Sequence, residues 1–282
     1  MTENKFNTIG IGVTFSPNLQ ANIFEASRFA LFFESKLVLI HVGDYSEEKE
    51  KKFKVLLSPF IEKQLDYEIV FQSGPPVDTI LSVCKSKKID LLILGALQRE
   101  SFVRYYVGSI ARKITRRAKC SVLLLINPSV NRIPRQYIVT SGLDEPETPH
   151  VIETAFYVGR QLQSERLTIV EEISKQDINI NVDDTKALRK TTIAKERMRL
   201  REASRVKKII DGIDSELKKN ILVNSQPIFG KRGYSIGHYA QVVRADLLVM
   251  AAPKKLSFWD RLFPHDIEHI LTELPTDVLI VQ

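Results

Sequence analysis

The strongest constraint on the fold is an internal repeat. When Gly74 is placed on Gly230, the two segments align without a gap to the end of the chain, at a constant offset of 156 residues. In this alignment DLLILGAL at 90–97 falls on DLLVMAAP at 246–253. Self-similarity at such a period indicates one fold unit that is built twice, and 282 residues are enough for two domains of ordinary size.

Composition is that of an ordinary globular protein, with 44% hydrophobic and 27% charged residues. No apolar run approaches the roughly 20 residues that a membrane-spanning helix needs, and the N-terminal residues lack the basic and apolar regions of a secretory signal. We therefore expect a cytoplasmic protein. The two cysteines, Cys84 and Cys120, are then expected to be reduced and buried.

Strand and helix signals alternate along the first repeat. Apolar runs predict strands at 7–14, 37–42, 67–72, 90–95 and 121–126, and helical periodicity predicts helices at 18–34, 46–64, 77–87 and 109–118. Strands that are apolar on both faces and alternate with helices predict a parallel sheet covered on both sides. With right-handed crossovers, this is an open, doubly wound α/β domain.

A second domain of the same class follows a linker at 126–136, which holds two prolines and shows no periodicity. Its predicted strands are 137–142, 167–173, 221–229, 246–251 and 277–282, and its predicted helices are 147–163, 185–220, 234–244 and 265–273. We therefore predict domain 1 at residues 1–127 and domain 2 at residues 136–282.

The predicted helix at 185–220 distinguishes the second domain. It contains twelve Lys and Arg and five Asp and Glu, so this segment alone accounts for the net charge of +7. Five apolar residues are expected to pack its C-terminal part on the sheet: Val206, Ile209, Ile210, Ile213 and Leu217. The segment 185–208 is either a solvated charged face or a docking surface for an acidic partner, nucleic acid or lipid. Of these partners we favour an acidic protein or a membrane protein, and no specific nucleic acid.

A candidate ligand site lies between the fourth strand and the helix that follows it. Gly95-Ala96-Leu97-Gln98 ends the predicted strand, nine residues follow, and Gly108-Ser109 opens a helix. A glycine at the carboxyl end of a strand lets a ligand approach the backbone. Gly-Ser at a helix N-terminus offers free N–H groups and the positive end of the helix dipole. Because open α/β sheets bind ligands at this edge, the pattern suits a nucleoside across Gly95 and a phosphate at Ser109.

This stretch, GALQRESFVRYYVGS, resembles the G-x2-G-x9-G-[ST] signature of the universal stress protein family. The preceding segment 73–95, with its Gly-x-Pro turn, is similar to that family as well, and the resemblance extends over the chain as a tandem pair. It implies a five-stranded parallel sheet of order 3-2-1-4-5 in each domain. It also implies pairing of domains through their last strands, within one chain as a pseudo-dimer and also in a homodimer. In many members it further implies ATP, with Mg²⁺, bound at the motif.

The resemblance implies a set of nucleotide-binding residues in domain 1: Thr14, Val42, Gly95, Gln98, Gly108, Ser109 and Ile110. Val42 matches the position whose backbone contacts adenine. Two residues of this set depart from the family pattern. Thr14 stands where the ATP-binding proteins of the family carry Asp, and Gln98 stands where the second glycine of the signature is expected. In the intervening loop, Arg99 and Arg104 either reach the phosphates or are solvated.

The second domain lacks the features of the motif. Its equivalent stretch is AAPKKLSFWDRLFPHD at 251–266, where Lys254 replaces the second glycine and Pro264-His265 replaces Gly-Ser. Pro264 has no N–H to donate, and Asp266 in the first helical turn would repel a phosphate. We expect this domain to be structural or regulatory.

These features predict a cytoplasmic stress or regulatory protein that binds ATP or another adenine nucleotide in domain 1, and not a dedicated enzyme. No Ser-His-Asp or Cys-His arrangement is recognisable, and the pair His265 and His269 lacks the three or four ligands of a metal site. One alternative is a nucleotide-free scaffold that regulates a membrane transporter through the basic segment 185–208. Another is a nucleotide hydrolase with slow turnover.

Overall fold

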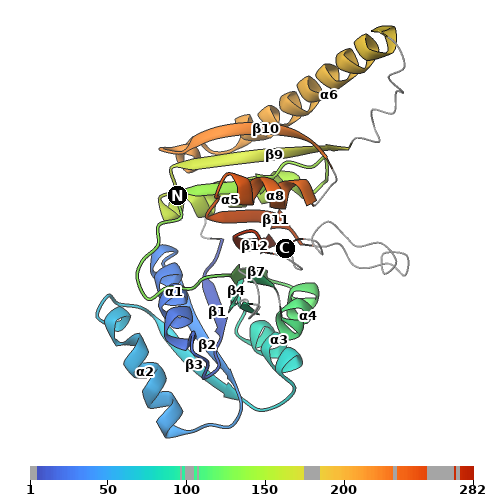
Figure 1. The fold of residues 1–282 in the computed structure, drawn as a ribbon. Helices are drawn as coiled ribbons and strands as arrows, with labels where there is room; N and C mark the ends of the chain where they lie inside the picture. The colour runs from blue at the N-terminus through green and yellow to red at the C-terminus, as the bar shows by residue number, and fades with distance from the viewer. Residues whose placement is uncertain are drawn as a thin grey trace. The chain divides into compact units, whose positions relative to one another are not determined.

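The computed structural model describes residues 5–95, 97–98, 105–106, 108–174, 185–230, 234–252, 270 and 274–282. The chain divides into two compact units (Figure 1). Unit 1 consists of residues 1–134 and 277–282, and unit 2 consists of residues 135–276. Among the helices described, none is both long enough and apolar enough to cross a membrane.

Unit 1 contains a parallel sheet with helices on both faces. Its parallel strands are β1 (Thr8–Gly12), β2 (Lys36–Val42), β3 (Tyr67–Gln72), β4 (Leu91–Gly95) and β7 (Ser121–Leu125). They lie in the order β3-β2-β1-β4-β7, which confirms the predicted order 3-2-1-4-5. Helices α1 (Leu19–Phe32) and α2 (Glu47–Ile61) pack against each other, as do α3 (Pro76–Ser86) and α4 (Ser109–Arg117), with the sheet between the two pairs. The predicted α/β fold class is confirmed.

The last strand of the chain lies in unit 1. Strand β12 (Asp277–Val281) pairs antiparallel with β7, and Leu279 stands opposite Leu123. The Asp277 side chain accepts a hydrogen bond from the Ile126 N–H at 2.9 Å, which fixes the start of this pairing. The second repeat thus ends in a strand that pairs with the last strand of the first, and residues 277–282 group with unit 1, whereas the predicted domain 2 extended to residue 282.

Unit 2 repeats the parallel sheet. Its strands are β8 (Tyr137–Ser141), β9 (Arg166–Ser174), β10 (Leu222–Gly230) and β11 (Leu247–Ala251), in the order β10-β9-β8-β11. Its described helices are α5 (Thr148–Leu162), α6 (Thr185–Gly212), α7 (Ser215–Lys218) and α8 (Tyr234–Val242). The predicted helix at 265–273 lies outside the described residues except for Ile270.

The predicted single helix at 185–220 is two helices. Helix α6 ends at Gly212, and the Asp214 side chain accepts a hydrogen bond from the Glu216 N–H at 3.0 Å, which caps the short helix α7. An Asp at this position favours a new helix start over continuation of the old helix. The predicted packing of the C-terminal part is confirmed at Val206, Ile213 and Leu217, which are buried, whereas Ile209 and Ile210 are half-buried.

The segment between β4 and α4 also contains strands that the sequence did not predict, since a loop was expected after Gln98. Strand β5 (Leu97–Gln98) pairs antiparallel with β6 (Tyr105–Tyr106), so that Gln98 stands opposite Tyr105 in a two-stranded sheet. The sequence shows no strand alternation there because each strand has only two residues.

Each unit contains the same hydrogen-bonded joint, which supports the internal repeat. In unit 1, the Asp90 carboxylate accepts hydrogen bonds from the N–H groups of Asn7 and Thr8, at 2.9 and 3.0 Å. In unit 2, Asp246 does the same with Gln136 and Tyr137, at 2.9 and 2.8 Å. One carboxylate therefore fixes the start of the fourth strand to the start of the first in each unit.

We expect Asp246→Ala to lower the free energy of unfolding of unit 2 by about 2–3 kcal/mol, because two charge-assisted hydrogen bonds are lost. Urea unfolding followed by circular dichroism measures the change. The control is Asp78→Ala, which breaks an ion pair with Arg117 at the surface of unit 1 and should change stability by less than about 1 kcal/mol. Equal effects of the two substitutions would show that the joint is not a stabilising feature.

Candidate functional site

The carboxyl edge of the sheet in unit 1 gathers three of the predicted site residues. Gly12 pairs with Ile40, so Thr14, just beyond the end of β1, lies level with Val42, the last residue of β2. Gly95 ends β4 on the other side of β1. Thr14 is exposed, whereas Val42 and Gly95 are half-buried. A ligand bound at this edge would therefore meet all three positions.

Helix α4 begins at the same edge, because it leads into β7, which runs parallel to β4. Gly108 is its N-cap, with φ −59° and ψ 161°, and no side chain caps the helix. In the described part of the chain, the N–H groups of Ser109, Ile110 and Ala111 donate no hydrogen bond. Ser109 and Ile110 are both exposed. Free N–H groups at the positive end of a helix dipole form an anion site of the type that binds phosphate.

Asn22 of α1 is a polar group of the site that the sequence did not reveal. A Cβ atom added to Gly95 would lie 3.2 Å from both the Nδ2 and the Oδ1 atoms of Asn22, so a larger residue there would press on this amide. The Oδ1 atom of Asn22 is buried and has no hydrogen-bond partner. Nothing in the helical pattern marks Asn22, because its contact with Gly95 depends on how α1 packs on the sheet. It offers an acceptor beside the glycine that a ligand would approach.

An aromatic cluster next to Thr14 was also missed. The ring of Phe15 stacks on Phe53 with centroids 5.2 Å apart and an interplanar angle of 14°. His41 meets the edge of Phe15 at 5.5 Å, and its Nδ1 atom lies 3.2 Å from the carbonyl oxygen of Val13. Phe15 keeps 46% of its surface exposed, whereas Phe53 is fully buried. In the sequence, the only indication of this cluster is that Phe15, an aromatic residue, directly follows a predicted strand. In the structure, Phe15 gives this edge of the sheet a flat apolar surface beside Thr14.

The remaining predicted site residues are only partly described. Gln98 lies in β5, where the structure describes the strand but not the side chain. Arg99 and Arg104 lie outside the described residues. The structure therefore brings Thr14, Val42, Gly95, Gly108, Ser109 and Ile110 to one edge of the sheet. Their roles as nucleotide ligands stay predictions.

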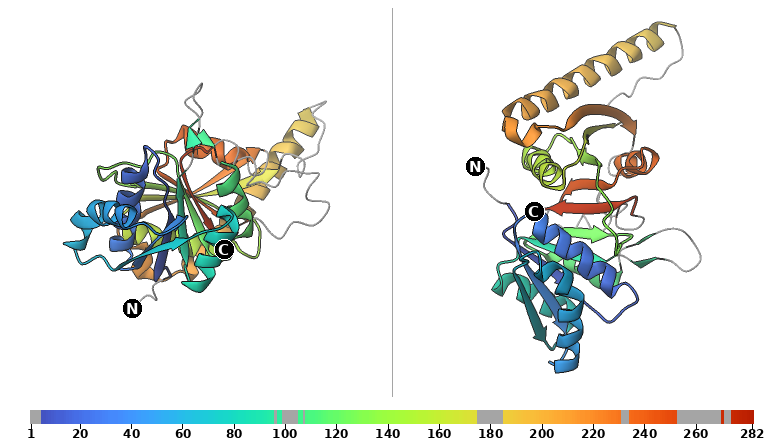
Figure 2. Two further views of the ribbon diagram at one scale, coloured as in Figure 1. Left: turned by 90° about the horizontal axis from the view of Figure 1, so that it is seen from below. Right: turned by 90° about the vertical axis from the view of Figure 1, so that its left-hand side faces the viewer.

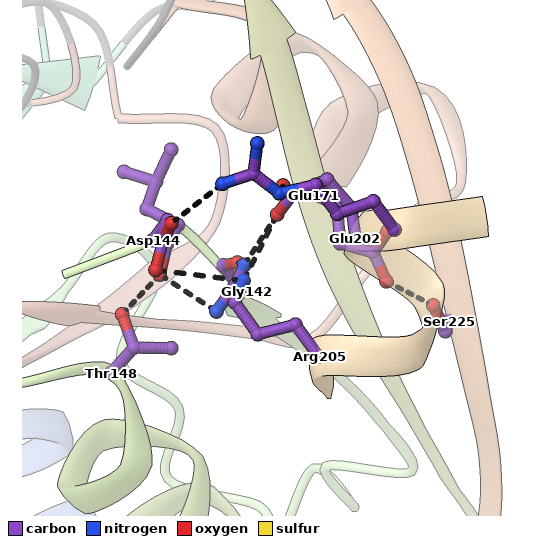
Figure 3. Close-up of polar contacts among 9 residues, drawn as sticks. Gly142, Asp144, Thr148, Glu171, Glu202, Arg205 and Ser225 are labelled. Carbon is purple, nitrogen blue, oxygen red and sulfur yellow. Dashed lines mark hydrogen bonds and ion pairs between the residues drawn. The ribbon is translucent and has the colours of Figure 1, made fainter. Parts of the chain in front are cut away.

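In the second repeat, an arginine occupies the corresponding edge (Figure 3). Arg205 of α6 donates a hydrogen bond to the carbonyl oxygen of Leu143 at 3.3 Å and another to that of Gly142, just beyond the end of β8. The guanidinium also pairs with Glu202 at 2.9 Å and lies 3.7 Å from Asp144. In unit 1 the carbonyl equivalent to that of Gly142 is that of Val13, which faces His41.

The close approach of α6 to β8 depends on Gly142. A Cβ atom at this position would lie 2.7 Å from the Cγ2 atom of Ile169 and 3.4 Å from that of Val206 on α6. The residues that would replace the phosphate-binding motif in this repeat, including Lys254, Pro264, His265 and Asp266, lie outside the described residues. Among the described residues, Arg205 occupies this edge of unit 2, and the absence of a ligand site in the second repeat stays a prediction.

Glu171 lies beside this arginine and is only 1% exposed. Its Oε1 atom accepts a hydrogen bond from the Ser225 hydroxyl, whereas its Oε2 atom has no hydrogen-bond partner. Burial raises the pKa of the Glu171 carboxyl and the charge of Glu202 raises it further, while Ser225 and Arg205 act in the opposite direction. This cluster was missed because it joins β9, β10 and α6, which are far apart in the sequence.

Among the described residues, no group of three or more His, Cys, Asp or Glu side chains could hold a metal ion. Cys84 and Cys120 are buried, as predicted. A hydrogen bond with Cys120, together with burial, raises the pKa of the Cys84 thiol, which disfavours its nucleophilic form.

Comparison with known proteins identifies the first repeat. Residues 5–125 match the sequence model of the Universal stress protein family. A functionally unknown protein from Pseudomonas aeruginosa PAO1 is similar in structure, with a TM-score of 0.70 and 16% identity over 99% of this chain and 93% of that chain. A universal stress protein from Archaeoglobus fulgidus DSM 4304 gives a TM-score of 0.68 and 16% identity over 99% of both chains. These likenesses show a tandem fold. No curated protein matches the chain.

Proposed function

Because residues 5–125 form a universal stress protein domain, we propose that unit 1 binds an adenine nucleotide, ATP with Mg²⁺, and that the protein is a cytoplasmic regulatory protein and not a dedicated enzyme. The observation that carries this proposal is the uncapped N-terminus of α4, which begins at the same edge of the sheet at which β4 ends with Gly95. Donors without partners and a glycine that admits a ligand are what a phosphate group needs there.

The residues present suit the parts of a nucleotide. The N–H groups of Ser109 and Ile110 would bind phosphate oxygens, and the Ser109 hydroxyl adds a further donor. Thr14 would hydrogen-bond the ribose through its hydroxyl, and the base would lie near Val42, with Phe15 exposed beside it. Bound Mg²⁺ supplies positive charge against the phosphates, as it usually does with one or two protein ligands.

A nucleotide-free scaffold is the second candidate, and two observations favour it. Thr14 brings no carboxylate to the edge of unit 1, and Arg205 covers the edge of unit 2 with its own hydrogen bonds. A scaffold of this kind would act through a protein partner, and its contact would be the basic segment 185–208.

The proposal predicts that calorimetric titration of desalted protein with ATP and Mg²⁺ shows one site per chain. We expect Gly108→Asp to weaken binding by at least about thirtyfold, because its carboxylate would occupy the free N–H groups of α4 and repel the phosphates. The helix should persist, since Gly108 has φ −59° and Asp is a favoured N-cap residue.

Two controls separate charge from position. Pro75→Asp adds the same carboxylate to the N-cap of α3, another helix of unit 1 without a side-chain cap, and should leave ATP affinity unchanged. Gly108→Asn fills the same position without charge and should weaken binding less than Gly108→Asp. The absence of heat with the unmodified protein, or equal affinity in Gly108→Asp, would reject the nucleotide site and favour the scaffold. Turnover that survives in Gly108→Asp would indicate a contaminating hydrolase.

A further inference from the structure

Helix α6 has an exposed face that combines positive charge with apolar side chains. Ile193 and Leu200 are 44% and 57% exposed, although they are large and apolar. Positions seven residues apart lie on the same face of a helix, so these two side chains form one exposed stripe. The cations Arg189, Lys190, Arg197 and Lys208 are also exposed and lie along both sides of the stripe.

The opposite face of α6 is the one that packs on unit 2. Thr191 and Val206 are buried, and Arg205 bonds to the end of β8. Figures 1 and 2 show that the N-terminal turns of α6 extend beyond β9 and β10, so their outer face is not covered by the sheet of this unit. The apolar stripe therefore does not belong to the core of unit 2.

The charge of the exposed face is not neutralised by the helix itself. Glu196, an acidic residue of α6, accepts two hydrogen bonds from Arg199, of 3.0 and 2.7 Å. In the described structure, Arg189, Lys190, Arg197 and Lys208 form no ion pair with an acidic side chain. The face thus presents cations without acidic partners, these four among them, around two apolar side chains.

We propose that this face of α6 docks on an anionic lipid bilayer. The cations would lie among anionic headgroups, to which each Lys or Arg near the surface is attracted. Ile193 and Leu200 would enter the boundary between headgroups and acyl chains, as the apolar residues of an interfacial helix do. A nucleic acid would use the cations but would provide no apolar layer for this stripe. An anionic bilayer matches both the charge and the apolar stripe of this face, whereas a nucleic acid matches the charge alone. Ile193 and Leu200 therefore favour the bilayer over the nucleic acid.

The test is sedimentation of the full chain with vesicles of phosphatidylglycerol and phosphatidylcholine, and with vesicles of phosphatidylcholine alone. We expect binding to the anionic vesicles only. The variant Arg189→Ala/Lys190→Ala/Arg197→Ala/Lys208→Ala should lose at least about a hundredfold in affinity, at roughly fivefold for each cation. The matched control removes four exposed cations of unit 1, Lys51, Lys63, Lys85 and Lys119, and has the same net charge. It should lose less than about threefold, because its cations lie outside the proposed face.

The variant Ile193→Ser/Leu200→Ser tests the apolar part of the proposal and keeps every charge. We expect it to bind the anionic vesicles at least about tenfold more weakly, since several buried methyl and methylene groups are lost. Its binding to duplex DNA should not change. Equal loss in the two four-cation variants, unchanged vesicle binding in Ile193→Ser/Leu200→Ser, or tighter binding to duplex DNA than to vesicles would each overturn the proposal. Thermal unfolding of every variant establishes that the fold is intact.

Discussion

Removal of residues 277–282 is expected to prevent stable folding of unit 1. These residues form β12, whose residues Val278, Leu279, Ile280 and Val281 are at most 3% exposed. Without β12, the apolar strand β7 would lose its antiparallel partner and become an open sheet edge. Burial of apolar side chains is worth about 1.5–3 kcal/mol for each, so four of them approach the whole stability of an ordinary domain.

The substitution Ile280→Ala tests the same strand with a smaller change than its removal. Ile280 is fully buried and pairs with Val122 of β7, so its truncation should lower the free energy of unfolding by about 2–5 kcal/mol. Ile133→Ala removes the same groups from an isoleucine that is 46% exposed in unit 1 and should change stability by less than about 1 kcal/mol. Hydrogen exchange at the amides of β7 identifies the unit that responds. Unchanged protection of β7 in the truncated chain would show that unit 1 folds without its last strand.

The sequence predicted the parallel sheets because their strands are buried on both faces, and such strands are continuous apolar runs. Leu92 and Ile93 of β4, for example, are both fully buried. The internal repeat also predicted that the two units correspond. Asp90 and Asp246 support this correspondence, because they accept equivalent backbone hydrogen bonds in the two units. Runs of this kind carry their signal locally, so they can be read without knowledge of the tertiary structure.

The site was less predictable because its contacts join distant segments. The glycines and the start of α4 could be predicted from one motif, since a glycine and a helix N-terminus act through the backbone. Asn22 reaches Gly95 only after α1 has packed on the sheet. Arg205 reaches Gly142 across 63 residues of sequence, and no periodicity distinguishes it from the other cations of α6. Side chains that act at a distance are found only in the folded chain.

Replacement of Arg205 by methionine is expected to lower the stability of unit 2 by about 3 kcal/mol near pH 7, because loss of one partner leaves a partly buried ion pair uncompensated. The side chains of Arg205 and Glu202 are 21% and 15% exposed. Methionine keeps much of the apolar stem but cannot donate to the carbonyl oxygens of Gly142 and Leu143. The control is Arg199→Met, which breaks an exposed pair with Glu196 on the same helix and should lower stability by less than about 1 kcal/mol.

The loss of stability in Arg205→Met is expected to depend on pH in a defined direction. Glu171 has a raised pKa in the folded state, so the folded state binds the proton more tightly and stability decreases as the pH rises through that pKa. Because Arg205 lowers the pKa of Glu171, its removal raises this pKa further. The charge of Glu202 on α6 then acts on Glu171 without that of Arg205, and Arg201 lies 3.9 Å from both Asp144 and Glu202. The deficit of Arg205→Met should therefore be largest near neutral pH and shrink as Glu171 becomes protonated in acid.

Urea unfolding of Arg205→Met at a series of pH values measures this profile, and the double variant Arg205→Met/Glu171→Gln identifies the group responsible. The glutamine side chain in that variant would keep an acceptor for the Ser225 hydroxyl, which now donates to Glu171, and would carry no charge. The double variant should recover part of the lost stability near pH 7 and show a flatter profile. A deficit that is equal at all pH values would mean that Arg205 stabilises unit 2 through its hydrogen bonds to the carbonyl groups of Gly142 and Leu143 alone. A pH-dependent deficit that glutamine relieves would mean that α6 is held over this edge by charge, through the same helix that carries the exposed basic face.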